Sequence, residues 1–122
     1  YYIIMEVLIR LYKALGYSWS GLKLAWASEY AFRLELWASL IVLPIACLLP
    51  VSMAIHFALI ASWLLVIVME LVNTAIEAVV DRISTAKHPL SKKAKDVASA
   101  AVLVALINAG IIWCWVLGQW VL

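Results

Sequence analysis

Four polar residues near the middle of the chain have a spacing that suggests chemistry. They are separated by three, four and four residues: Glu70, Asn73, Glu77 and Asp81. At about 100° per residue, this spacing places all four on one narrow stripe of a helix. A carboxylate in or near the hydrocarbon of a membrane costs several kcal/mol unless it is paired or metal-bound, so it indicates a functional site. The stripe therefore predicts a site that handles protons or cations.

The same stripe has a second interpretation, which is the solvated face of a helix that leaves the membrane. Asp81 and Arg82 fit this interpretation, because they lie at the polar end of the segment. Glu70 fits it poorly, because an uninterrupted apolar run precedes it. The spacing alone leaves both interpretations open.

The distribution of charge predicts the elements that would position this stripe. Hydrophobic residues make up 68% of the 122 residues and charged residues only 13%, about half the usual share of a soluble domain. No charge occurs over 36–69, which is too long for one span and is broken near Pro50, or over 97–122, which holds one span. We expect a single-domain, all-α membrane protein over 1–122, with transmembrane helices at about 30–49, 52–82 (including a cytoplasmic extension) and 96–120.

The N-terminal segment has a different pattern. Apolar residues recur there at helical spacing: Ile4, Leu8, Leu11 and Leu15. Polar residues lie on another face of the same helix. This pattern predicts an amphipathic helix over about 1–27 that lies on the membrane surface. All nine Lys and Arg residues lie either before or at the start of the first span, up to Arg33, or in the 82–95 loop. The positive-inside rule therefore places the N-terminus and that loop in the cytoplasm, and the C-terminus on the other side.

The predicted hairpin brings further carboxylates to matching heights. Glu35 and Glu70 lie 16 and 19 residues from a turn near residue 51. If both helices continue, Glu29 and Glu77 also match, at 22 and 26 residues from the turn and about 10 Å nearer the cytoplasm. Oxygen ligands suit Mg²⁺, which uses one or two carboxylates together with phosphate oxygens. We therefore expect a magnesium site at Glu29 and Glu77.

The third span opens with Lys95 and Asp96, for which two interpretations remain. Asp96 is either an acid favoured by the helix macrodipole, or it faces the same site as Glu77 together with Lys95. Familiar nucleotide and hydrolase motifs are absent, including the P-loop, the kinase glycine-rich loop and the G-x-S-x-G elbow. A nucleotide enzyme with this sequence would need a fold of its own.

The run from Glu70 to Arg82, E-x-x-N-x-x-x-E-x-x-x-D-R, resembles the signature of the small integral-membrane bacterial diacylglycerol kinases. Further blocks match that family in order and spacing, and the resemblance covers roughly residues 10–115. These blocks are Ala14–Trp19, Gly21–Leu22, Glu29 with Ala31–Arg33, Ala94–Asp96 and Ser99–Leu103.

The resemblance implies a lipid kinase that transfers the γ-phosphoryl group of MgATP to diacylglycerol, giving phosphatidic acid. It implies a homotrimeric helical bundle in the bacterial inner membrane, with a surface helix and three transmembrane helices in each protomer and the C-terminus in the periplasm. ATP, diacylglycerol, Mg²⁺ and membrane lipids are the expected partners, and no nucleic acid is expected.

The resemblance also implies roles for individual residues. Glu70 is the expected general base, and Glu29 and Glu77 are the expected metal ligands. The expected nucleotide-binding residues are Arg10, Tyr17, Glu29, Asn73, Glu77, Asp81, His88, Lys95 and Asp96. The expected lipid-substrate residues are Arg10, Ser18, Trp19, Arg33, Glu35, Glu70, Ser99 and Trp113.

Two other functions remain as alternatives. A relative that phosphorylates undecaprenol would share the carboxylate signature. A small membrane transporter or accessory protein would use intramembrane carboxylates for protons or cations. Transfer of label from ATP to either lipid would distinguish both kinase functions from the transporter function.

Overall fold

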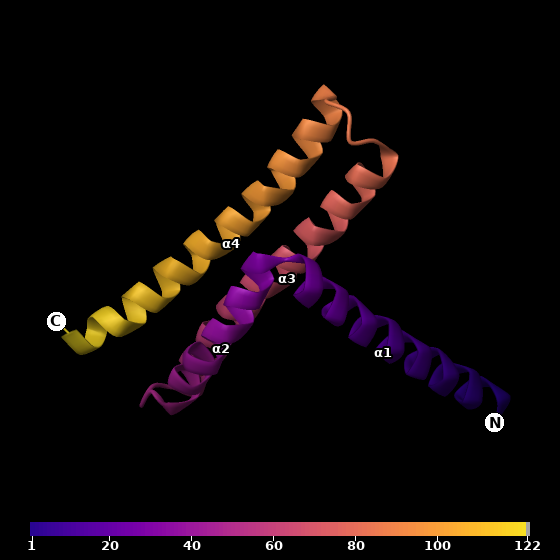
Figure 1. The fold of residues 1–122 in the computed structure, drawn as a ribbon. Helices are drawn as coiled ribbons and strands as arrows, with labels where there is room; N and C mark the ends of the chain where they lie inside the picture. Colours follow the sequence, from indigo (N-terminus) through magenta and orange to yellow (C-terminus); the bar gives the residue numbers. More distant parts are fainter. Residues whose placement is uncertain (122) are drawn as a thin grey trace. The chain divides into compact units, whose positions relative to one another are not determined.

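The structure is a computed structural model that describes residues 1–121 (Figure 1). All the regular secondary structure of these residues is α-helical. The chain forms two compact units, Tyr1–Tyr30 and the remainder of the described chain from Ala31. Within the described residues there are four helices: α1 (Tyr2–Ser28), α2 (Tyr30–Leu48), α3 (Met53–Ile83) and α4 (Pro89–Val121).

Three of these helices are long and apolar enough to cross a membrane. They are α2, α3 and α4, with 19, 31 and 33 residues. At 1.5 Å per residue, α3 and α4 exceed the thickness of a hydrocarbon core of about 30 Å, so they can extend beyond it. The expected all-α fold with three helices able to span a membrane is confirmed by their length and composition.

The first unit is the single helix α1. It continues without interruption through Gly16 and Gly21, and nearly all of its side chains are exposed. It ends at Ser28, because Glu29 has an extended backbone, with φ −115° and ψ 109°. The break falls between the expected surface helix (about 1–27) and the expected first span (about 30–49), so the helix continuity on which the height match of Glu29 depended is not present at Glu29. No glycine or proline occurs from 22 to 43, so the break coincides with the change from a mixed to an apolar segment.

A short turn joins α2 to α3, as the hairpin prediction required. Pro50 lies within it, and Ser52 caps α3 by accepting a hydrogen bond from the Ile55 N–H at 3.4 Å. His56 on α3 then contacts α2, where its Nδ1 lies 2.6 Å from the Ala46 carbonyl oxygen. These contacts hold the two helices together at the turn.

Helices α3 and α4 lie side by side and are joined by the segment 84–88 (Figure 1). Pro89 is the first residue of α4, a position where its fixed φ suits a helix and its missing N–H costs nothing. Val66 packs against Ala105 and Ala109, since alanines let two helix backbones approach closely. A second cluster, Ala46, Leu59 and Val116, joins all three spanning helices.

Candidate active site

The polar stripe of α3 begins inside the helical packing. Glu70 is 5% exposed and Asn73 is 8% exposed, and both continue the buried face that Leu59, Ser62 and Val66 begin. Asp81 is exposed at the other end of the stripe. The solvated-face interpretation therefore holds for Asp81 but not for Glu70 and Asn73.

Asn73 and Glu77 form one polar unit along the stripe. The Asn73 amide Nδ2 donates a hydrogen bond to Glu77 Oε1 at 3.2 Å. The other end of the same amide, Oδ1, is buried and has no hydrogen-bond partner among the described residues. A buried carbonyl oxygen without a donor is unusual, because leaving it unpaired is unfavourable. It marks a place where a cation or a donor group would be stabilised.

Glu35 of α2 and Glu70 of α3 interact electrostatically across the hairpin. Their carboxylates are close enough to interact electrostatically, in agreement with the matching heights expected from the sequence. Glu35 is partly buried, and its Oε2 has no hydrogen-bond partner among the described residues. Two carboxylates in one poorly solvated place repel each other, so the position is one where a cation or a hydroxyl donor would be stabilised.

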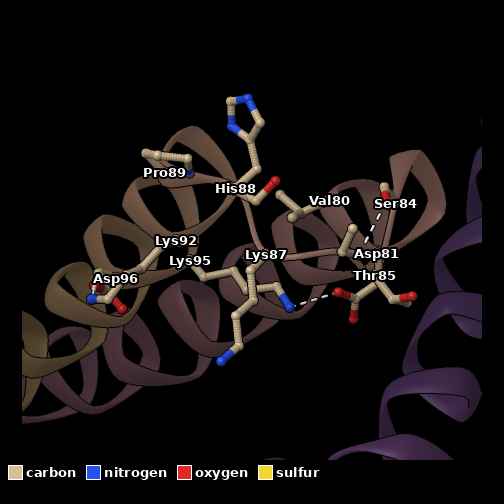
Figure 2. A pocket seen from close by; sticks show the side chains of 12 residues that line it. Val80, Asp81, Ser84, Thr85, Lys87, His88, Pro89, Lys92, Lys95 and Asp96 are labelled. Carbon is tan, nitrogen blue, oxygen red and sulfur yellow. Dashed lines mark hydrogen bonds and ion pairs between the residues drawn. The ribbon is translucent and has the colours of Figure 1, made fainter.

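Lys95 brings a positive charge from α4 to the exposed end of the stripe. Its Nζ donates to Asp81 Oδ1 at 2.6 Å (Figure 2). Lys95 also interacts electrostatically with Glu77. Lys95 precedes the uncharged part of α4, and the hydrogen bond to Asp81 raises its pKa above the ordinary value for lysine. Its ammonium therefore stays charged at neutral pH. Asp96 instead pairs with Lys92 on the same helix.

A cavity of about 670 Å³ opens between the end of α3 and the start of α4 (Figure 2). Four of the expected nucleotide-binding residues line it: Asp81, His88, Lys95 and Asp96. Its other polar lining residues were not expected as individual site residues; they are Ser84, Thr85, Lys87, Ser91 and Lys92. Their only signal in the sequence was their place in a polar loop.

His88 has a structural contact within this cavity. Its Nδ1 accepts a hydrogen bond from the Leu90 N–H at 3.1 Å, which satisfies one of the free donors at the start of α4. The opposite side of the loop is held by Ser84, whose Oγ accepts from the Ala86 N–H at 3.0 Å. The loop is thus shaped by local hydrogen bonds from two polar side chains.

The described residues contain no group of three or more His, Cys, Asp and Glu side chains placed to hold a metal ion. The oxygen atoms that α3 does offer are the Glu77 carboxylate and the unpaired Asn73 Oδ1, one turn apart. Such a donor set fits Mg²⁺, which takes few protein ligands and completes its shell with water and phosphate oxygens.

The other expected site residues of the first unit lie on α1 or at its end. Arg10, Tyr17, Ser18 and Trp19 are all exposed on α1. Glu29 is partly buried at the extended residue that ends the helix. These residues belong to Tyr1–Tyr30, which is described here by itself.

The remaining expected lipid-site residues of the second unit are not gathered in one place. Arg33 is partly buried on α2, and Ser99 is exposed on α4. Trp113 lies between helices, where its indole N–H donates to the Leu59 carbonyl oxygen at 3.3 Å. Leu59 is 11 residues from Glu70 along α3, roughly 16 Å at 1.5 Å per residue. Trp113 is therefore far from the carboxylates along the helix.

An apolar groove of about 610 Å³ runs between α3 and α4. It begins at Met69 and Val97, beside Glu70 and just beyond Asp96, and continues past Ala101 to Asn108. Ser99 does not line it. The groove offers apolar surface next to the buried end of the polar stripe.

Comparison with known proteins gives one consistent result. The sequence profile of the family described as "Prokaryotic diacylglycerol kinase" matches residues 16–117. The diacylglycerol kinase of Escherichia coli (strain K12) is 53% identical over 105 residues, which cover 86% of both proteins. The diacylglycerol kinase of Pseudomonas aeruginosa is 44% identical over 108 residues, 88% of both proteins. That of Helicobacter pylori (strain J99) is 46% identical over 104 residues, 85% of this chain and 81% of the relative.

Proposed function

The chain belongs to the prokaryotic diacylglycerol kinase family, and on that premise we propose that it transfers the γ-phosphoryl group of MgATP to the hydroxyl of diacylglycerol. It is a membrane kinase that acts on diacylglycerol. The observation that carries the proposed chemistry is the polar stripe of α3, which runs from buried Glu70 to exposed Asp81 and meets Lys95 at its end. Such a stripe connects a lipid-accessible depth with a water-accessible cavity.

Glu70 is the proposed general base. It would accept the proton of the lipid hydroxyl while that oxygen attacks the γ-phosphorus and ADP leaves. It is buried at the inner end of the polar stripe and interacts with the neighbouring Glu35 carboxylate. A carboxylate is one of the side chains that serve as general bases. The apolar groove that begins at Met69 would hold an acyl chain beside this carboxylate.

Magnesium is the proposed cofactor, with Glu29 and Glu77 as its carboxylate ligands. The support from the second unit is the pair of oxygen donors on Asn73 and Glu77. When bound, the ion would neutralise phosphate charge. Phosphoryl transfer depends mainly on such neutralisation and on positioning.

The cavity at the start of α4 is the proposed nucleotide site. Lys95 supplies a charged donor for phosphate oxygens, and Asp81 holds it in place. Polar side chains on the loop offer hydrogen bonds to the remainder of the nucleotide. The full proposed set is Arg10, Tyr17, Glu29, Asn73, Glu77, Asp81, His88, Lys95 and Asp96.

The proposed lipid site extends from the carboxylates toward the interior of the membrane. Glu35 and Glu70 would lie near the lipid hydroxyl, whereas Trp113 would contact an acyl chain at greater depth, given its distance along the helix. The full proposed set is Arg10, Ser18, Trp19, Arg33, Glu35, Glu70, Ser99 and Trp113.

We further propose a homotrimer in the bacterial inner membrane, with the N-terminus and the 82–95 loop in the cytoplasm and the C-terminus in the periplasm. The positive charges that flank the spans support this orientation. The amphipathic pattern of residues 1–27 supports a helix on the membrane surface. Neighbouring protomers would help to shield the polar stripe from lipid.

A lipid-labelling assay tests the proposed function. Purified protein in detergent micelles is given radiolabelled ATP and Mg²⁺ with either dioleoylglycerol or undecaprenol. We expect label in phosphatidic acid. Label only in undecaprenyl phosphate would mean that the protein is a lipid kinase whose substrate is undecaprenol and not diacylglycerol. Labelling of neither lipid would contradict the kinase assignment and favour the transporter.

A further inference from the structure

We propose that Ser39 and Trp63 are positioning residues, whose hydrogen bond holds α2 against α3 so that Glu35 stays beside Glu70. The proposal rests on the proposed function, because it takes Glu70 as the general base. Neither residue stood out in the sequence. Both are uncharged residues within the 34-residue apolar run that forms the hairpin.

The contact is a direct polar link between two membrane helices. The Trp63 indole Nε1 donates to Ser39 Oγ at 2.8 Å. The same hydroxyl donates to the main-chain carbonyl oxygen of Glu35 at 2.7 Å. Ser39 is 8% exposed, so water has little access to this link. One hydroxyl thus connects a side chain of α3 to the backbone of the residue that carries the Glu35 carboxylate.

The positions of the two residues fit this role. Ser39 and Trp63 each lie 12 residues from residue 51, in the turn, so they occupy the same depth on the two helices. Ser39 is one helical turn from Glu35, and Trp63 is two turns from Glu70. Residues seven apart on a helix share a face. The link therefore lies on the faces that carry the carboxylates, and one to two turns deeper than they do.

Glu35 depends on its backbone for placement. Its Oε2 is buried and has no hydrogen-bond partner among the described residues, so that oxygen does not anchor the carboxylate. A second polar contact between the two helices, His56 with Ala46, lies close to the turn and is further from Glu35 than Ser39 is. In the hydrocarbon, no water is available to replace a broken hydrogen bond, so breaking the Ser39–Trp63 hydrogen bond is unfavourable.

The test compares variants that break this link with variants that spare it. Trp63→Phe keeps an aromatic ring but removes the indole N–H, and Ser39→Ala removes the hydroxyl. Ser39→Thr retains a hydroxyl. Ser62→Ala is the matched control, because Ser62 is equally buried but its hydroxyl bonds to Leu59 within its own helix. Trp115→Phe, at an exposed position, controls for loss of an indole.

We expect Trp63→Phe and Ser39→Ala each to lower kcat for diacylglycerol by about two- to thirtyfold, the range over which substitutions outside a site change its energetic coupling to another. The KM for MgATP should stay near that of the parent, and the pH profile of kcat should shift. Ser39→Thr should recover most of the rate. The fall in kcat of the double variant should be no greater than that of the less active single variant, since both changes break the same hydrogen bond.

Rates are normalised to folded protein, measured as the fraction that elutes at the parent's position in detergent. Variants that match the parent in kcat and pH profile would overturn the positioning role. A loss shared equally by Ser62→Ala, or one that raises the KM for MgATP in step with the fall in kcat, would also overturn it. An inactive parent would instead contradict the proposed function, so the two failures are distinguishable.

Discussion

The ammonium nitrogen of Lys95 on α4 lies 2.6 Å from the Asp81 carboxylate on α3, although the two residues are 14 apart in the sequence. Both side chains are about half exposed, and an exposed ion pair contributes little to the stability of a fold. The pair lines the cavity between the helices, and Lys95 also interacts with Glu77. We infer that Asp81 serves to direct Lys95 toward a phosphate.

Lys95→Met should weaken nucleotide use more than it weakens the fold. Removing one charged hydrogen bond to a phosphate should raise the KM for MgATP by about ten- to a hundredfold. The thermal midpoint in detergent should change little. Lys93→Met is the matched control, because Lys93 is exposed on the same helix but does not line the cavity. Equal KM values for both variants would remove Lys95 from the nucleotide site.

Glu77→Gln and Glu29→Gln should each raise the magnesium concentration that gives half-maximal rate. Each change removes a negative ligand while nearly preserving shape. We expect an increase of at least about tenfold, since the loss of even outer-sphere partners of a metal ligand costs about ten- to a hundredfold in affinity or activity. Titrations with MgCl₂ at fixed ATP measure the effect, and Glu6→Gln, at an exposed position of α1, is the control. An unchanged magnesium dependence in both variants would argue against the metal site.

The charge pattern predicts much of this fold because charges are excluded from hydrocarbon. The uncharged runs therefore mark the three apolar helices correctly. The 3, 4, 4 spacing likewise predicts that Glu70 and Asp81 share a face, but periodicity does not say how deeply each is covered by a neighbouring helix. The apolar run before Glu70 favours its burial over that of Asp81, and the packing of α2, α3 and α4 decides between the two interpretations.

The backbone break at Glu29 and the contacts of two tryptophans with other helices could not be predicted from the sequence. Glu29 adopts an extended backbone without any glycine or proline nearby, so the change from an amphipathic to an apolar pattern indicates a boundary there but not the backbone conformation. Trp63 and Trp113 each place an indole N–H on an oxygen of another element, Ser39 Oγ and the Leu59 carbonyl. A tryptophan pattern alone does not distinguish such inward contacts from an anchor at the membrane surface.

We expect the active protein to be a homotrimer. Each chain supplies three spanning helices, too few to enclose the carboxylates of α3 and the polar groups around them. Native mass spectrometry of an active preparation should show a trimeric mass, with crosslinking as the second measurement. An active preparation that contains only monomers would contradict this prediction.

The central claim is that Glu70 takes the proton from the lipid hydroxyl, and Glu70→Gln tests it most directly. Glutamine keeps the volume and the hydrogen-bonding capacity but does not accept the proton, so kcat should fall by about 100- to 10,000-fold. ATP affinity should stay near normal, because Glu70 lies roughly 10 Å from Glu77 along α3. The measurement is kcat together with the dissociation constant for MgATP in one preparation. A kcat within a few-fold of the parent would contradict Glu70 as the base, and loss of ATP binding together with kcat would place Glu70 in the metal site instead.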